Sequence, residues 1–363
     1  MTAGAFPASG SEASSLPAAS LRDEATRLAQ AWMRHEAGML QDYLVQDVED
    51  PRLNVQSILT RHFLIEQLFG ERFAGLQEQE LRFALAANWL LSLLRRSAGA
   101  DDFAAVFHAL QQGADNAEGT EIPAYIRQTF AAFPSGPGAG EPDSMAIAIP
   151  NYFAQFLTET AFNQSPPRLP PRALDTFAEV WPQALTTAES GRLKILELAC
   201  GSANDYRALA ASGLARRLDY TGLDLCEKNV TNARNLFPGI DFAVGNAFAL
   251  ETSDLSFDCA FAHDLYEHLS ISAMETALAE LGRVTRSAFS LGFFNMHEED
   301  DHVVQPVEEY HWNTLSLPRV RTLLEGKGFS VQAIHLDTYL TWRFGCDQTH
   351  NKNAYTLVGR RTG

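Results

Sequence analysis

Between Gly191 and Gly363, short apolar runs alternate with segments of helical periodicity, and no other feature constrains the fold as strongly. Apolar runs separated by helices are typical of a parallel sheet built from βαβ units. Strands are predicted at Leu193–Leu198, Leu218–Asp224, Asp241–Val244, Phe257–Ala262, Ser287–Phe294, Phe329–Leu336 and Ala354–Gly359. Helices are predicted at Asp205–Ala211, Glu227–Leu236, Ser270–Leu281 and Leu317–Gly326. The pattern predicts the α/β class with a seven-stranded doubly wound sheet, whose last two strands pair antiparallel.

The N-terminal part has a different rhythm, in which apolar residues return every three or four positions, as on one helical face. Leu81, Leu85, Trp89 and Leu93 follow this spacing within a strongly apolar stretch. That stretch holds more apolar surface than a small helical unit buries alone, so we expect a homodimer. The domains predicted are a disordered tail at 1–20, a helical N-terminal domain at 21–170 and an α/β domain at 190–363.

The charge balance limits the partners. The chain has 28 Lys and Arg against 45 Asp and Glu, a formal net charge of −17. Such a chain repels phosphate backbones and anionic lipid, and no basic patch interrupts the pattern. Residues 1–20 lack the basic start and apolar run of a signal peptide. We therefore expect a cytoplasmic protein that acts on a small molecule and binds neither nucleic acid nor a membrane.

Polar and small residues collect where the predicted strands end. The first end reads ELACGSAND, from Glu197 to Asp205, and the second ends on Asp224. The third reads GNA, from Gly245 to Ala247, and the fourth ends on His263-Asp264. Ligands of doubly wound sheets bind at this edge, and a carboxylate after the second strand can accept both hydroxyls of a ribose. A small-residue turn that opens a helix lets a ligand approach unpaired backbone N–H groups.

This series of motifs, ELACGSAND, YTGLDL, GNAFAL and FDCAFAHDLYEHLS, resembles the class I S-adenosylmethionine-dependent methyltransferases over about residues 190–363. The resemblance implies a Rossmann-like methyltransferase sheet and S-adenosylmethionine as the cofactor. The residues implied to contact it are Glu197, Gly201 and Ala203 around the methionine part, Asp224 with Leu225 at the ribose, Asn246 and Ala247 beside the adenine, and His263. Tyr152 is expected to reach the cofactor from the helical domain, which would cover the pocket.

The turn after the first strand departs from the family pattern. The usual second glycine is Ala203 and the third is Asn204, which puts the contacts of this turn in question. A GxGxxG pattern that would cradle a pyrophosphate is absent, and this argues against NAD. Taken alone, Glu197 could instead cap a helix or form an ion pair, and Asp224 could be a turn former.

A second histidine-rich region follows the fifth predicted strand, as HEEDDH at 297–302 and EYHWN at 309–313. With His263 and Asp264, one later histidine completes the two-histidine, one-carboxylate set typical of non-haem iron. These features resemble the metal-dependent α-keto acid C-methyltransferases that act on phenylpyruvate, 4-methyl-2-oxovalerate and 2-ketoarginine. That resemblance implies a divalent metal, iron, held by His263, Asp264 and His311. The later histidine could instead be His302 or His297, HEEDDH could be a solvated acidic loop, and His311 could merely line the pocket.

Three functions follow from these motifs. The first is methylation at the β-carbon of an α-keto acid through a metal-stabilised enolate, with His263, Asp264 and His311 as catalytic residues. The second is a metal-free O- or N-methyltransferase of a secondary metabolite, in which His263 or His311 acts as general base. The third is a non-catalytic protein that binds the cofactor. It is considered because the turn at Ala203 and Asn204 departs from the family's glycine pattern.

Overall fold

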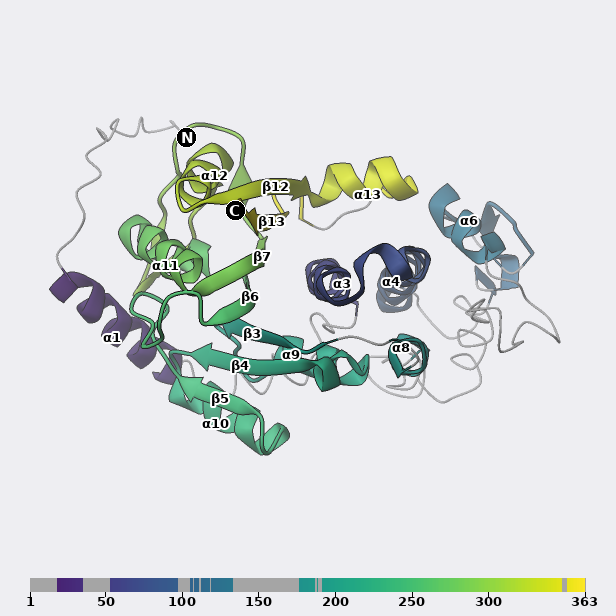
Figure 1. Cartoon of the computed structure of the whole chain (residues 1–363). Helices are drawn as coiled ribbons and strands as arrows, with labels where there is room; N and C mark the ends of the chain where they lie inside the picture. The colour runs from purple at the N-terminus through teal and green to yellow at the C-terminus, as the bar shows by residue number, and fades with distance from the viewer. Residues whose placement is uncertain are drawn as a thin grey trace, which may run out of the picture.

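A seven-stranded sheet forms the centre of the C-terminal half (Figure 1). The computed structural model describes residues 18–34, 53–96, 105–106, 108–110, 112–117, 119–132, 176–186, 188, 191–347 and 351–362. The strands are β3 (Leu193–Leu198), β4 (Leu218–Asp224), β5 (Asp241–Val244), β6 (Phe257–His263), β7 (Thr285–Phe293), β12 (Phe329–His335) and β13 (Tyr355–Arg361). Their order across the sheet is β12-β13-β7-β6-β3-β4-β5.

All pairs from β7 to β5 are parallel, whereas β13 runs antiparallel to both β7 and β12. The chain order reverses between β3 and β6, so the switch point of the sheet lies at the carboxyl ends of these two strands. The predicted α/β class, the seven strands and the antiparallel pairing of the last two are confirmed. The fold is the Rossmann-like arrangement of methyltransferases.

Helices cover both faces of the sheet because consecutive strand residues point to opposite sides. On β3, Ile195 belongs to the core shared with α9 (Asn204–Ala211) and α10 (Glu227–Leu236). Its neighbour Leu196 belongs to the opposite core, shared with α11 (Ile271–Val284) and α12 (Leu317–Glu325). These four helices were predicted from the sequence. Helix α13 (Leu336–Phe344), which follows β12 directly, was not.

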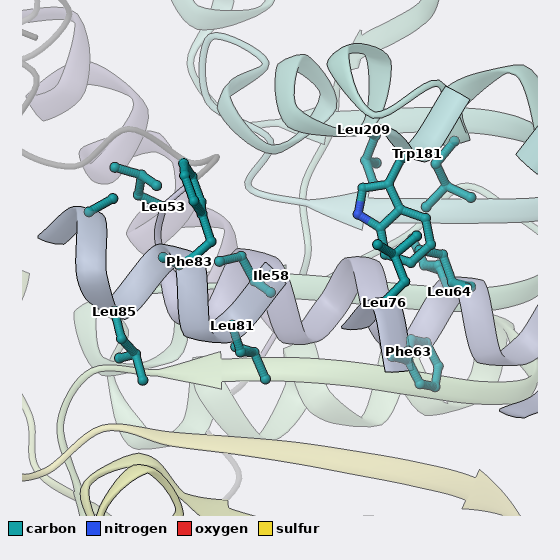
Figure 2. Packing of buried hydrophobic residues seen from close by; sticks show 14 of the residues in the cluster. Leu53, Ile58, Phe63, Leu64, Leu76, Leu81, Phe83, Leu85, Trp181 and Leu209 are labelled. Atoms are coloured by element: carbon teal, nitrogen blue, oxygen red, sulfur yellow. The ribbon is translucent and has the colours of Figure 1, made fainter. Parts of the chain in front are cut away.

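Five further helices precede the sheet in the described part of the chain. They are α1 (Ala18–Arg34), α3 (Val55–Phe69), α4 (Ala74–Arg96), α6 (Ala124–Ala132) and α8 (Thr176–Thr186). The apolar residues of α3 and α4 join the same core as Ile195, and Figure 2 shows Trp181 of α8 pointing toward Leu64 and Leu76. The apolar excess that led us to expect a dimer is thus buried within one chain. None of the described helices is long and apolar enough to cross a membrane.

A buried ionic network joins α3, α4 and α8. The Glu80 carboxylate accepts hydrogen bonds from Arg61 at 2.9 Å, His62 at 2.7 Å and the Trp181 indole at 3.0 Å. Burial raises the pKa of Glu80, but the Arg61 charge and the His62 contact outweigh it and lower that pKa to about 2. Because the Glu80 carboxylate on α4 is bound by two residues of α3 and by Trp181 of α8, it fixes the three helices relative to one another.

Helix α1 lies across the carboxyl ends of the strands, beside the arrowhead of β4 in Figure 1. At one end Glu24 accepts hydrogen bonds from the backbone N–H and the hydroxyl of Ser270, which begins α11. At the other end the Met33 sulfur lies 3.7 Å from the Cys226 sulfur, before α10. Ala25 and Leu28 of α1 are buried in the core that contains Leu196 and residues of α11 and α12. Tyr152, expected from sequence to reach the cofactor, lies outside the described residues.

Candidate cofactor and acceptor site

The turn between β3 and α9 is built from residues in the left-handed backbone region. Its φ angles are 57° at Ala199, 53° at Gly201 and 67° at Ala203, every second residue of the turn. An L-residue adopts this conformation at a cost of roughly 1–2 kcal/mol, so each position is one where glycine fits best. Ala203, predicted to stand at a family glycine position, has the left-handed conformation that suits glycine; Ala199 shares this conformation, and Asn204 is the first residue of α9.

Glu197, the next-to-last residue of β3, has only 3% of its surface exposed. The Tyr220 hydroxyl donates a hydrogen bond of 2.5 Å to Glu197 Oε2. Burial raises the pKa of Glu197 well above its usual value, and the nearby Asp205 and Asp224 carboxylates raise it further. The site is therefore short of positive charge.

Asp224 is the last residue of β4 and connects two loops of the edge. Its Oδ2 accepts from the Gly201 N–H at 2.9 Å, and its Oδ1 accepts from the Cys226 N–H at 2.8 Å and the Asn229 amide at 3.2 Å. A carboxylate offers about four acceptor positions, so about one remains for a ligand. The predicted ribose ligand is thus also the residue that supports the β3–α9 turn.

The remaining predicted cofactor residues stand along the same edge. Asn246 Oδ1 accepts from the Phe248 N–H at 2.9 Å and caps the turn after β5. Leu225 and Ala247 are partly buried against the core that α1 shares. The side-chain oxygen of Asn246, which was predicted to lie beside the adenine, is thus already used by its own turn.

His263, the last residue of β6, is held at both ring nitrogens. Its Nδ1 lies 3.0 Å from Asp205 Oδ2, in the first turn of α9, and its Nε2 lies 2.9 Å from the Thr60 hydroxyl of α3. Only 10% of its side chain is exposed. The hydroxyl of Ser290 on β7 lies 2.8 Å from that of Thr60. A chain of polar groups therefore crosses from α9 through β6 to α3 and β7.

The pKa of His263 balances opposing effects. Burial lowers the pKa, but the Asp205 charge and hydrogen bond, helped by the charge of Asp264, raise it above the ordinary value of 6.5. Asp264 itself is exposed and has a φ of 50°, which turns the chain sharply away from β6. Strained backbone at a strand end is common at functional sites.

The predicted metal set is not assembled. Among the described residues, no group of three or more His, Cys, Asp or Glu side chains lies close enough to hold a metal ion. Both nitrogens of His263 face protein partners. His311 belongs to a hairpin beside α1, where Glu24 and Arg27 are its charged neighbours. The site therefore does not fit iron at His263, Asp264 and His311.

The two other histidines considered as ligands lie on the loop after β7. His302 Nδ1 accepts the Ser316 N–H at 2.9 Å, and burial with the Arg319 charge lowers the pKa of His302 to about 4. His297 Nε2 is buried and has no hydrogen-bond partner in the described structure. Neither belongs to the chain of polar groups at His263.

The sequence did not point to three residues that complete the site. Asp205, Ser57 and Thr60 all contact His263 directly or through one another. Asp205 stood inside the ELACGSAND motif, at the start of a helix, and this position was the one available signal. No sequence signal points to Ser57 and Thr60, because they lie on helix α3, far from the motifs in sequence.

Comparisons with known proteins identify the domain. Residues 195–288 match the family described as a methyltransferase domain. The phthiotriol/phenolphthiotriol dimycocerosates methyltransferases of Mycobacterium tuberculosis and Mycobacterium bovis are 32% identical over 139 residues, which covers 35% of this chain and 48% of theirs. The chain thus spans about half the length of these curated relatives.

Among solved structures, an S-adenosylmethionine-dependent methyltransferase from Mesorhizobium loti is 17% identical, with a TM-score of 0.38, covering 51% of this chain and 98% of that one. The [4+2]-cyclase SpnF is 18% identical, with a TM-score of 0.37, covering 52% and 81%. From the family match, residues 195–288 are a methyltransferase domain, as the motifs predicted.

Proposed function

We propose that this protein transfers a methyl group from S-adenosylmethionine to a hydroxyl group of a small molecule, without a metal ion. The observation that carries the proposal is the pair of buried carboxylates, Glu197 and Asp224, at the carboxyl edge of the sheet and within the residues that match a methyltransferase domain. Neither forms an ion pair with any residue that the structure describes.

Buried carboxylates without a cation are costly, because burial removes the water that stabilises their charge. A positively charged ligand relieves that cost. S-adenosylmethionine carries a sulfonium and an ammonium group, and it supplies an electrophilic methyl group. The left-handed turn at Ala199, Gly201 and Ala203 brings backbone close to the ligand, and nothing lies within 4 Å of a Cβ placed on Gly201. The residues present therefore fit this cofactor.

His263 is the residue we assign to the acceptor. A hydroxyl is a weak nucleophile until it loses its proton, and a histidine at the edge of the site can accept that proton as general base. Its ring is oriented by Asp205 and Thr60, from two different helices. Water is excluded by α3 on one side, and we propose that α1 covers the cofactor side.

A hydroxyl acceptor is favoured by the curated relatives, whose name describes substrates that are triols. Methylation of an α-keto acid carbon through a metal-bound enolate stays a weaker alternative. It would require Asp205 and Thr60 to release His263 and the later histidine to approach it. The homodimer also stays a prediction, and light scattering at micromolar concentration tests it.

The proposal is tested with methyl-labelled S-adenosylmethionine and a panel of catechols, simple phenols and aliphatic diols, beside a panel of α-keto acids. Label transfer to a hydroxyl compound in the presence of EDTA is the expected result. His263→Gln should lower the rate by about 10²–10⁴-fold, the usual contribution of a general base. Transfer confined to keto acids and abolished by EDTA would overturn the proposal.

A further inference from the structure

We infer that Asp205 is a positioning residue that fixes the tautomer and orientation of His263, and that helix α3 completes this arrangement through Ser57 and Thr60. The inference rests on the proposed role of His263 as the base. It assigns functions to three residues, of which Ser57 and Thr60 lie outside the family motifs, and makes helix α3 part of the acceptor site.

The hydrogen bonds define the protonation pattern. An ionised Asp205 can only accept, so His263 Nδ1 must carry a hydrogen to donate across 3.0 Å. In a neutral ring the lone pair is then on Nε2, the nitrogen that faces the Thr60 hydroxyl at 2.9 Å. Thr60 donates to Nε2, which leaves Ser290 to donate to Thr60 at 2.8 Å. Nε2 therefore carries the lone pair of the ring: it takes the hydroxyl hydrogen of Thr60 as Thr60 takes the proton of the acceptor, so the proton reaches His263 through Thr60.

Asp205 is itself held from a second side. The Ser57 hydroxyl donates to Asp205 Oδ1 at 2.5 Å, while Oδ2 faces His263. Burial raises the pKa of Asp205, but the His263 charge and the hydrogen bonds with His263 and Ser57 outweigh burial. The pKa of Asp205 therefore lies below its ordinary value. A carboxylate fixed at both oxygens holds its partner ring at one angle, which a carboxylate free to rotate does not.

The position of Asp205 links the two halves of the site. It is the second residue of α9, immediately after the Gly201–Asn204 segment that we assign to the cofactor. On the other side, α3 supplies both hydroxyl contacts across 148 and 203 positions of sequence. Any shift of the turn or of α3 therefore moves the base.

The charged groups around His263 come from three elements. Asp205 of α9 and Asp264 after β6 favour the protonated ring, and Arg61 of α3 opposes it. Removing the Asp205 charge leaves Asp264 as the only one of these groups that favours protonation. The pKa of His263 should then fall, since burial acts in the same direction as Arg61.

The experiment follows His263 directly by NMR, using the ¹³Cε1–¹H signals of the 10 histidines and assigning His263 by its loss in His263→Gln. In the wild type the pKa of His263 should exceed 6.5, and in Asp205→Asn it should fall to 6.5 or below. Asp254→Asn is the matched control, because Asp254 is 74% exposed and pairs only with Arg283 among the residues described. An unchanged pKa of His263 in Asp205→Asn would overturn the inference.

Kinetics separate this inference from the proposed function. Using whichever hydroxyl probe accepts label, Asp205→Asn should lower kcat by about 10²–10⁴-fold and leave S-adenosylmethionine affinity within a few-fold. Ser57→Ala, the milder variant if Asp205→Asn does not fold, should lower kcat by about 2- to 10-fold. If His263→Gln is inactive while both of these keep full activity, the positioning role fails and the base assignment survives. If His263→Gln keeps full activity, the proposed function fails first.

Discussion

The Tyr220 hydroxyl reaches Glu197 by passing over Gly222, the residue paired with Glu197 in the β3–β4 ladder. Tyr220 and Gly222 lie on the same face of β4, two residues apart, so the tyrosine ring occupies the space that a side chain at 222 would fill. A Cβ at this position would come within 2.7 Å of the Tyr220 hydroxyl oxygen and 2.8 Å of the Phe242 ring. The absence of a side chain at Gly222 therefore leaves room for the hydrogen bond from Tyr220 to the buried Glu197 carboxyl.

Gly222→Ala should displace Tyr220 and lower the free energy of unfolding by about 1–3 kcal/mol, the usual cost of overpacking a core. Thermal and urea denaturation measure the change. Gly191→Ala is the matched control, because nothing lies within 4 Å of a Cβ there. Equal stability of the two variants would mean that the Tyr220 ring is not held against Gly222.

Ala199→Gly should stabilise the protein by up to about 1 kcal/mol, because glycine relieves the left-handed strain at φ 57°. The gain is reduced by the larger conformational entropy of glycine in the unfolded chain. Ala279→Gly, in the middle of α11, is the control and should lose about 1 kcal/mol. Denaturation of both variants gives the comparison, and a loss at 199 as large as at 279 would contradict the strained turn.

Glu80→Gln should destabilise the protein by about 3–5 kcal/mol, because it removes the carboxylate charge that pairs with the buried Arg61. Glu78→Gln on the same helix removes more exposed ion pairs with Arg82 and Arg343 and should cost no more than about 1 kcal/mol. Urea denaturation at neutral pH separates them. Similar losses would show that the Glu80 network does not hold the helices together.

The Glu80 network should also make the free energy of unfolding depend on pH in the acid range. The pKa of Glu80 is lowered from 4.5 to about 2, so its ionised form is favoured by folding. This contribution is complete above pH 4.5 and is lost as the pH falls through about 2. The difference in unfolding free energy between the wild type and Glu80→Gln should therefore shrink between these values. A difference that stays constant over this range would contradict the assigned pKa.

Much of the fold could be predicted because the central strands are largely buried and read as short, mainly apolar runs between helical segments. LKILEL became β3 with the bounds expected, and Glu227–Leu236 became α10. Helix α13 escaped because its apolar pattern is weak and it follows β12 without a break. The left-handed conformation of Ala199 was not predicted, since residue type alone does not reveal φ.

Only those site residues that belong to the strand-end motifs could be predicted from the sequence. Glu197 and Asp224 end neighbouring strands, so their proximity follows from parallel pairing. The metal set predicted at His263, Asp264 and His311 is not brought together in the described structure, because residue types carry no distances. The true neighbours of His263, Asp205 and Thr60, lie 58 and 203 positions away, and tertiary packing alone brings them together.

The most direct test of the account is calorimetric titration of S-adenosylmethionine into the wild type and Glu197→Ala. The buried carboxyl should contribute to binding of the charged cofactor, so the variant should bind about 10- to 100-fold more weakly, which corresponds to ~1.5–3 kcal/mol. Circular dichroism must show both proteins folded. Absence of binding to the folded wild type, or equal Kd values for the two proteins, would contradict the assignment of this edge to S-adenosylmethionine.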